Sequence, residues 1–317
     1  MSRIQNKKTA VQQHRVEAGQ SGRRIDNYLA SHFKGLPKKR LYQMLRKGEV
    51  RVNGRRIRQD YRLEEGDNIR IPPMTPQAPL SSDAPPPDYL LTRVKESLLY
   101  EDEHLLVINK PAGIVVHGGS GRTFGIIEIL RHLRGTEEFL QLAHRLDRET
   151  SGVLLLARDM PYLKALQDCF RDGTLKKCYL ALLCGSLGKP VIDVAQPLER
   201  DLLRSGERLS AIRESGKAAF SRFRLREKRK QSSLVQVEIG TGRTHQIRVH
   251  AASIGHPVAG DEKYGNRQCN RIFRQLGLKR MFLHASAVEI PPLLDQPKLS
   301  LEAPLPRELE TILSGGC

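Results

Sequence analysis

The stretch His144-Arg-Leu-Asp-Arg-Glu-Thr-Ser-Gly152 is followed directly by the apolar run Val-Leu-Leu-Leu-Ala at residues 153–157. Five consecutive apolar residues next to a polar, glycine-ending segment predict a short buried strand. Asp147 is therefore expected on a loop that leads into the core, between the cations Arg145 and Arg148. A nearby cation favours the ionised form of a carboxylate. The pattern fits an active carboxylate, and it also fits an ion pair that only stabilises the loop.

Similar apolar runs recur after residue 100. They occupy residues 105–109, 178–183 and 234–239, and segments with helical character lie between them at residues 126–134, 161–170 and 244–254. Strands and helices do not alternate regularly, so a parallel βαβ fold is disfavoured. We expect an α+β domain built on a mixed, mainly antiparallel sheet.

Seven prolines fall within residues 72–87. Such a segment is extended and semi-rigid, so we expect a linker at 72–90 between a small α/β domain at 21–71 and a larger domain at 91–317. In the small domain, Ile25, Leu29 and Phe33 recur at helical spacing. The pair Asn53-Gly54 predicts a tight turn between strands. Residues 1–20 are polar and are expected to form an N-terminal tail.

The charge of the chain is strongly basic and unevenly distributed. The 317 residues carry a formal net charge of +18, and residues 1–80 alone hold 18 Lys or Arg against seven Asp or Glu. This excess favours a nucleic-acid partner, because neutralised phosphates release counterions, although a basic surface without such a partner is the alternative. The candidate RNA-binding residues of the small domain are Lys38, Lys39, Arg40, Arg46, Lys47, Arg51, Arg55 and Arg56.

Composition and spacing exclude several other classes. No apolar run approaches the ~20 residues that cross a bilayer, so no membrane association is expected. The polar N-terminus lacks the apolar core of a secretory signal, which predicts a cytoplasmic protein. The five cysteines show no zinc spacing and are expected to be reduced thiols, and no metal site is predicted.

A second polar cluster occupies residues 240–250, Gly-Thr-Gly-Arg-Thr-His-Gln-Ile-Arg-Val-His. A glycine-rich turn there leads into a helix that is expected to begin at Thr244. His245 and His250 are five residues apart, which disfavours a pair of zinc ligands on one helix face. The segment lacks the ending of a phosphate-binding P-loop, so no nucleotide cofactor is expected. Arg248 is more suited to an anion partner than to a metal.

The local sequence of two smaller features indicates a structure but no function. Lys110-Pro-Ala-Gly113 lies between apolar runs at 105–108 and 114–116, which predicts a hairpin turn with Gly113 at positive φ. Tyr179 lies near the start of a predicted strand, where packing is the simpler interpretation.

Four segments together resemble a known family. In chain order they are the block around Asp147, Lys177-Cys178-Tyr179, the segment 242–250, and Phe282-Leu283-His284-Ala285. They are similar to the RluA-type RNA pseudouridine synthases, and most similar to the C-type group that acts on large-subunit (23S) ribosomal RNA. Residues 21–71 are similar to the S-four-like RNA-binding domain. The resemblance covers nearly the whole chain and implies a pseudouridine synthase fold for residues 91–317.

The resemblance also implies roles for individual side chains at the reacting centre. Asp147 would be the nucleophile, Tyr179 would stack on the target base, and Arg248 would be the ion-pair partner of Asp147.

Four further residues would bind the substrate. Arg145 would enter the RNA stack as the uridine leaves it, Leu283 would form an apolar wall, and Arg243 and His245 would lie near the bound nucleotide.

The implied reaction isomerises uridine to pseudouridine in structured ribosomal RNA by base flipping. It would need neither a cofactor nor a metal, and the protein is expected to be a monomer. Two other functions remain open. An RNA glycosidase would need a second acid, for which Glu149 is the candidate. A ribosome-assembly factor would bind RNA without catalysis.

Overall fold

The computed structural model describes residues 11–17, 20–33, 38–73, 85–118, 124–135, 138–202 and 208–315, and the chain divides into two units at residues 1–85 and 86–317. The division falls within the proline-rich stretch. None of the described helices is long and apolar enough to cross a membrane.

The first unit is a small α/β domain. Its elements are the strands β1 (Gln12–Arg15), β2 (Arg51–Val52) and β3 (Asn68–Ile71) and the helices α1 (Ile25–His32) and α2 (Lys38–Lys47). The three strands pair antiparallel in the order β1-β3-β2. Asn53 and Gly54 both have positive φ, which is the geometry of the predicted tight turn. Part of the segment expected as a polar tail belongs to this unit, because β1 pairs with β3 and Val16 is buried in the core.

The second unit contains one large sheet, a separate hairpin and six helices among the described residues. The strands are β4 (Leu98–Glu101), β5 (Leu105–Lys110), β6 (Gln141–Leu142), β7 (Ser151–Ala157), β8 (Lys176–Cys184), β9 (Val191–Val194), β10 (Leu198–Leu202), β11 (Arg208–Ile212), β12 (Ser221–Lys228), β13 (Ser232–Ile239), β14 (Leu283–Ile290) and β15 (Leu299–Glu302). The helices are α3 (Asp88–Lys95), α4 (Ile126–Arg134), α5 (Met160–Asp172), α6 (Gln246–Ser253), α7 (Arg267–Gln275) and α8 (Arg307–Ser314).

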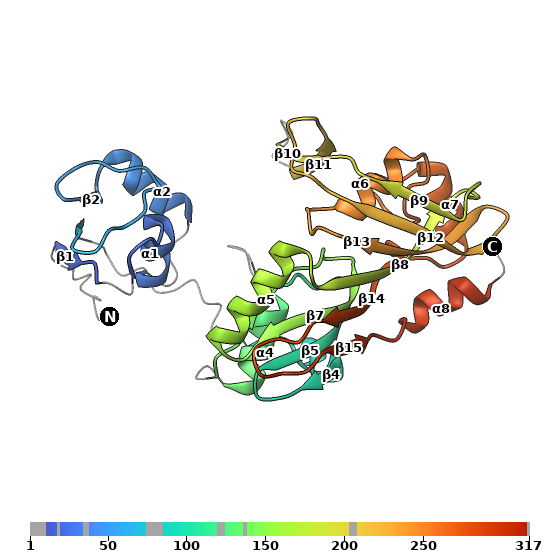
Figure 1. The fold of residues 1–317 in the computed structure, drawn as a ribbon, viewed down its shortest axis with the longest axis horizontal. Coiled ribbons are helices and arrows are strands. Elements are labelled where there is room, and N and C mark those ends of the chain that lie inside the picture. The colour runs from blue at the N-terminus through green and yellow to red at the C-terminus, as the bar shows by residue number, and fades with distance from the viewer. Residues whose placement is uncertain are drawn as a thin grey trace, which may run out of the picture. The chain divides into compact units, whose positions relative to one another are not determined.

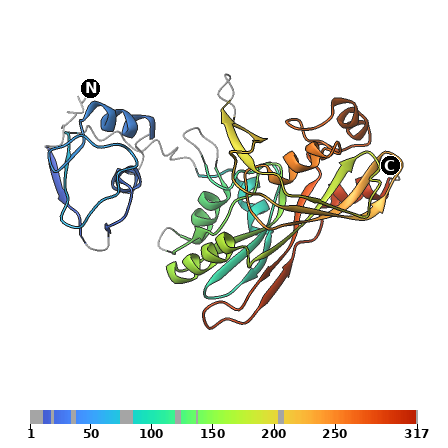
Figure 2. The same cartoon turned by 45° about the horizontal axis from the view of Figure 1, so that its top comes forward.

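The large sheet has the order β4-β5-β7-β14-β8-β13-β12-β9, with β15 beside β14 and β6 beside β7. Among the described strands of this sheet, the β14–β7 pairing alone is parallel, so the prediction of a mixed, mainly antiparallel sheet is confirmed. The strands β10 and β11 form a hairpin of their own that stands out from the body of this unit (Figures 1 and 2).

Apolar residues alternate between the two faces of the sheet. On one face, Leu154 and Leu156 of β7 belong to a core cluster that includes α4 residues and Ile247 of α6. On the other face, Val153 and Leu155 pack with apolar residues of α5. All seven residues of β7 are buried, as the continuous apolar run predicts. Figure 1 shows α4 and α5 beside β5 and β7.

Gly152 fixes the point where the polar block enters β7. Its φ is 114°, and a Cβ atom at this position would lie 2.1 Å from the backbone oxygen of Ala285 in β14. Only glycine fits such a close approach at positive φ. The last residue of the polar block therefore lets β7 and β14 meet directly below the loop that carries Asp147.

Three local expectations need correction. Cys184 and Cys269 form a disulfide, so not all cysteines are reduced thiols; β8 and α7 bring their Cα atoms to 6.2 Å across 85 residues of sequence. Cys169 and Cys178 are free, and Cys317 lies outside the described residues.

The other two corrections concern secondary structure. Gly113 has the expected positive φ, but residues 114–116 form no strand and only Ile114 and Val116 of this run pack into the core, so no hairpin forms. Helix α6 begins after His245 rather than at Thr244, because His245 adopts the left-handed conformation and occupies the N-cap.

Candidate active site

The loop that carries Asp147 is fixed by hydrogen bonds to its backbone carbonyls from both sides. The buried ammonium group of Lys110 donates to the carbonyl of Arg148 at 3.1 Å, and also to two carbonyls of its own turn. Gly113 N–H donates to the same Arg148 carbonyl at 2.8 Å. From the other side, Arg280 donates to the carbonyl of Glu149 at 3.2 Å. These bonds hold the loop although it has no regular secondary structure.

The carboxylate of Asp147 pairs with the guanidinium of Arg248 from α6. Arg248 Nη1 lies 3.0 Å from Asp147 Oδ2, and the two side chains are only 11% and 20% exposed. Such partial burial strengthens the charge interaction relative to a surface pair. The anion beside Arg248 is therefore a carboxylate of the same chain.

Asp261 holds the other edge of the same guanidinium. Its oxygens accept from Arg248 Nε at 2.7 Å and from Nη2 at 2.8 Å, a bidentate geometry that fixes the plane of the guanidinium. The carboxylate of Asp261 is fully buried and also accepts backbone N–H bonds from Lys263 and Tyr264. Burial opposes the ionised form of Asp261, but Arg248 and these N–H groups lower its pKa. Burial likewise opposes the charge of Arg248, while Asp261 and Asp147 raise its pKa.

Asp147, Tyr179 and Leu283 line a cavity of about 90 Å³ beside Arg248. Tyr179 projects from β8 and Leu283 from the start of β14, two neighbouring strands of the sheet. Burial raises the pKa of Tyr179, and the nearby Asp147 raises it further, so its phenol stays protonated. Among the described residues that line this cavity, Asp147 is the only acid.

His245 approaches the same carboxylate from the N-terminus of α6. Its Nε2 lies 3.8 Å from Asp147 Oδ2, and its Nδ1 lies 2.8 Å from the hydroxyl oxygen of Tyr264. Burial lowers the pKa of His245, and Arg248 and Lys263 act in the same direction. The Arg248 guanidinium also lies over the Tyr264 ring, with its Cζ atom 5.0 Å from the ring centroid.

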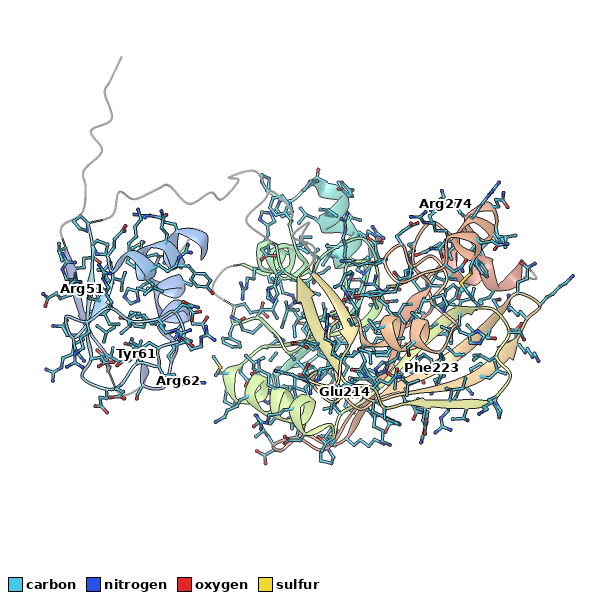
Figure 3. The ribbon with its side chains drawn as sticks, turned by 90° about the horizontal axis from the view of Figure 1, so that it is seen from above. Arg51, Tyr61, Arg62, Glu214, Phe223 and Arg274 are labelled. Carbon is cyan, nitrogen blue, oxygen red and sulfur yellow. A yellow bond between two sulfur atoms is a disulfide. The ribbon has the colours of Figure 1, made fainter. Side chains whose placement is uncertain are left out.

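The predicted substrate residues Arg145 and Arg243 also line the cavity that contains Asp147. Arg145 is exposed and also lines an adjoining groove of about 920 Å³, to which Lys263, Arg274 and Lys279 contribute. Figure 3 shows Arg274 on α7. Arg243 donates to the carbonyl of Ala218 at 3.1 Å. All seven site residues named from the sequence therefore line one cavity.

The predicted RNA-binding residues of the first unit are mostly exposed. They lie on α2, on β2 and after the turn at Asn53, and the described side chains are those of Arg40, Arg46, Lys47, Arg51, Arg55 and Arg56. Figure 3 labels Arg51 on this unit. Arg40 pairs with Glu49 at 3.0 Å, so part of its charge is compensated within the unit. The side chains of Lys38 and Lys39 lie outside the described part of the chain.

Sequence reasoning missed Asp261 and Tyr264. Both lie in the segment before α7, and none of the seven site residues named from the sequence lies next to either of them. Asp261 follows a glycine and precedes two charged residues, which is the pattern of an ordinary polar turn. Lys110 was noticed only as part of a turn, since nothing in its local sequence indicates burial of an ammonium group.

Comparison with known proteins gives two matching family descriptions. Residues 104–253 match the family described as RNA pseudouridylate synthase, and residues 23–69 match the S4 domain. The first range contains Asp147, Tyr179 and Arg248.

Several curated relatives are similar over nearly the whole chain. The proteins named ribosomal large subunit pseudouridine synthase C from Vibrio cholerae and Escherichia coli are each 43% identical, and the matches cover 97% and 94% of both partners, respectively. The protein of that name from Pasteurella multocida is 44% identical over 96% of this chain and 93% of its own.

Among solved structures, the human protein named RNA Pseudouridylate Synthase Domain Containing 4 matches with a TM-score of 0.59 and 26% identity, covering 72% of this chain and 95% of its own. The human Domain Containing 1 protein matches with a TM-score of 0.57 and 27% identity, covering 68% and 86%.

Proposed function

Because this chain belongs to the RNA pseudouridylate synthase family, we propose that it isomerises uridines of large-subunit (23S) ribosomal RNA, with Asp147 as the reacting carboxylate. The observation that carries the proposal is the ion pair between Asp147 and Arg248 at a cavity walled by Tyr179 and Leu283. The ribosomal substrate is that named for the curated relatives.

The reaction needs a carboxylate and a closed space rather than a second reactant. The bond between uracil N1 and ribose C1′ breaks, a bond between C5 and C1′ forms, and the proton of C5 is lost while N1 gains one. The carboxylate of Asp147 lies beside Arg248 and can stabilise the electron-poor ribose that is left when the base detaches. Tyr179 and Leu283 supply an aromatic and an apolar wall against which the free uracil is retained and turned.

Arg145 is suited to the space that the flipped nucleotide leaves. Its side chain is exposed and lines both the inner cavity and the outer groove. A planar guanidinium can stack between bases and also neutralise phosphates. We assign Arg243 and His245 to contacts with the bound nucleotide, since both line the inner cavity.

A glycosidase is less well supported by this geometry. Hydrolysis of a glycosidic bond generally uses two carboxyl groups on opposite sides of the bond. Glu149, the second acid considered from the sequence, lines only the outer groove, and its closest ion-pair partner among the described residues is Arg148, at 3.5 Å. The inner cavity therefore supports isomerisation better than hydrolysis.

The first unit is suited to binding RNA rather than to catalysis. Its match to the S4 domain and its exposed cations fit a module that binds structured RNA. We further propose that the protein acts as a monomer in the cytoplasm and without a nucleotide or metal cofactor.

The test is to incubate unmodified large-subunit ribosomal RNA with the purified chain, to map pseudouridine and to assay free uracil in the same sample. The proposal expects pseudouridine at discrete positions and no free uracil. Release of uracil would support the glycosidase, and RNA binding without either product would support a non-catalytic assembly factor. Activity that persists after dialysis against a chelator, in a sample whose mass matches one chain, would support the cofactor and monomer assignments.

A further inference from the structure

The hydroxyl group of Tyr264 is hydrogen-bonded to His245 of the site, although Tyr264 itself does not line the inner cavity. Its oxygen accepts the backbone N–H of Ser210 in β11 at 2.8 Å and lies 2.8 Å from His245 Nδ1. The ring is partly buried between His245, whose ring it meets edge to face, and the Arg248 guanidinium. The side chain is thus held at three points.

This arrangement decides which nitrogen of His245 carries the hydrogen. The phenol hydrogen of Tyr264 needs an acceptor, and among the described residues His245 Nδ1 is the one within hydrogen-bonding distance. If Nδ1 were protonated, that phenol hydrogen would have no such acceptor, and the lone pair of Nε2 would face the carboxylate of Asp147. When Tyr264 donates to Nδ1, the ring hydrogen of His245 lies on Nε2. The Nε2–H group then faces Asp147, with Nε2 3.8 Å from Oδ2.

The groups around His245 favour its neutral form. Asp147, on the loop before β7, and Asp261, before α7, promote its protonation, whereas Arg248 and Lys263 oppose it. The described contact from β11 is the backbone N–H of Ser210, which meets Tyr264 rather than the imidazole. Burial is the largest influence and lowers the pKa of His245. A neutral imidazole can donate from Nε2 only in the tautomer that carries the hydrogen on Nε2.

We propose that Tyr264 is a positioning residue: its hydroxyl group holds His245 as the Nε2–H tautomer, so that a neutral N–H donor faces Asp147 and the reacting uridine. This inference rests on the proposed function and adds a residue and a role to it. The hydrogen bond on the remote nitrogen of a histidine commonly sets the tautomer and orientation of the ring, and its loss typically costs 10- to 100-fold in activity at metal sites.

The test uses Tyr264→Phe, which removes the hydroxyl and keeps the ring against His245 and Arg248. Tyr100→Phe is the matched control, because the Tyr100 hydroxyl also donates one short hydrogen bond, to Asp102 at 2.7 Å, away from the site. We expect Tyr264→Phe to lower the single-turnover rate constant roughly 10-fold near pH 8 with little change in KM. Tyr100→Phe should match the wild type.

The pH profile distinguishes positioning from a general loss of structure. In Tyr264→Phe the Nδ1 tautomer becomes accessible, but protonation of the imidazole restores a hydrogen on Nε2. Because burial lowers the pKa of His245, the defect should shrink only as the pH falls through the titration of this imidazole, which nitrogen-15 NMR of the same variant locates. A defect of equal size on both sides of that titration would overturn the proposal.

A double-mutant cycle supplies the second criterion. In a His245→Ala background, Tyr264→Phe should change the rate constant less than about 2-fold, because the group through which it acts is gone. A full 10-fold loss in that background would show that Tyr264 acts by another route and would overturn the proposal.

The tautomer can also be read without activity. Nitrogen-15 NMR of the full chain should show His245 with Nδ1 unprotonated and Nε2 protonated in the wild type, and a mixture in Tyr264→Phe. A wild-type protein with the opposite tautomer contradicts the inference. A wild type that forms no pseudouridine contradicts the proposed function instead, and the NMR result still decides the tautomer.

Discussion

Arg248 Nη1 lies 3.0 Å from Asp147 Oδ2, so two residues 101 positions apart in the chain form the ion pair at the centre of the site. The same guanidinium is bound on its other edge by the fully buried Asp261. One cation thus connects the Asp147 carboxylate to a second carboxylate that does not line the inner cavity. The position of Asp147 depends on this arrangement as well as on its own loop.

Replacing Asp261 should therefore damage both stability and activity. In Asp261→Asn the buried Arg248 loses the charge of one partner, and breaking a buried ion pair typically costs about 3–5 kcal/mol. We expect a decrease of that order in the free energy of unfolding by urea, together with a reduced rate of pseudouridine formation. Glu262→Gln is the control: its carboxylate is 75% exposed and pairs with Arg274, so its loss should cost less than about 1 kcal/mol. Equal effects of the two substitutions would contradict this account.

Lys110 should make the stability of the second unit depend on pH. Burial lowers its pKa to about 7, from an ordinary value of 10.5, so the unfolded chain binds more protons than the folded chain between these values. The resulting contribution to stability is present above pH 10.5 and is lost as the pH falls through about 7. Relative to Lys110→Met, the wild-type free energy of unfolding should rise by roughly 3 kcal/mol between about pH 7 and about pH 9.5, at about 1.4 kcal/mol per unit. Urea unfolding of both proteins at these pH values measures this difference in the free energy of unfolding. If the free energies of the two proteins changed with pH in parallel, the predicted effect of burying Lys110 would be refuted.

The disulfide between Cys184 and Cys269 should stabilise the second unit. It closes a loop with a sequence separation of 85, for which a stabilisation of about 2–4 kcal/mol is typical. A reductant should lower the melting temperature of the wild type, and Cys184→Ser/Cys269→Ser should show the lower value with or without it. Cys169→Ser, at a free cysteine, should retain the sensitivity of the wild type. A wild-type melting temperature that does not respond to reductant would contradict the bond.

The exposed arginines of the first unit should set the salt dependence of RNA binding. Each of Arg55→Ala and Arg56→Ala should weaken binding of large-subunit RNA and reduce the slope of log K against log salt by up to about 1. Arg222→Ala is a control in the other unit, since Arg222 is engaged by Asp193 through two hydrogen bonds. Filter binding at several salt concentrations gives the slopes. Unchanged slopes in both first-unit variants would show that residues other than Arg55 and Arg56 make the phosphate contacts.

Local sequence patterns predicted the elements that carry the site better than the contacts between them. The apolar run after Gly152 predicted β7, and the apolar run at 178–183 placed Tyr179 near the start of a strand. Residues 114–116 are also apolar, yet they form no strand and only Ile114 and Val116 pack in the core, since apolarity alone does not distinguish a strand from a buried loop.

Long-range contacts account for what the sequence did not predict. The contacts of Asp261 and Tyr264 form only when the segment before α7 folds against α6, and the Cys184–Cys269 bond forms only when α7 itself packs beside β8. No spacing rule connects these positions. The buried ammonium of Lys110 was missed for the same reason, because one of its acceptors, the Arg148 carbonyl, lies 38 residues away.

The most direct test of the account compares the wild type with Asp147→Asn on unmodified large-subunit ribosomal RNA, measuring RNA binding and mapped pseudouridine in parallel. The substitution keeps the size of the side chain and removes its charge. We predict RNA affinity within about 3-fold of the wild type and a loss of pseudouridine of at least about 10³-fold, because the reacting carboxylate is gone. Pseudouridine formation by Asp147→Asn at the wild-type rate would contradict the central role given to Asp147.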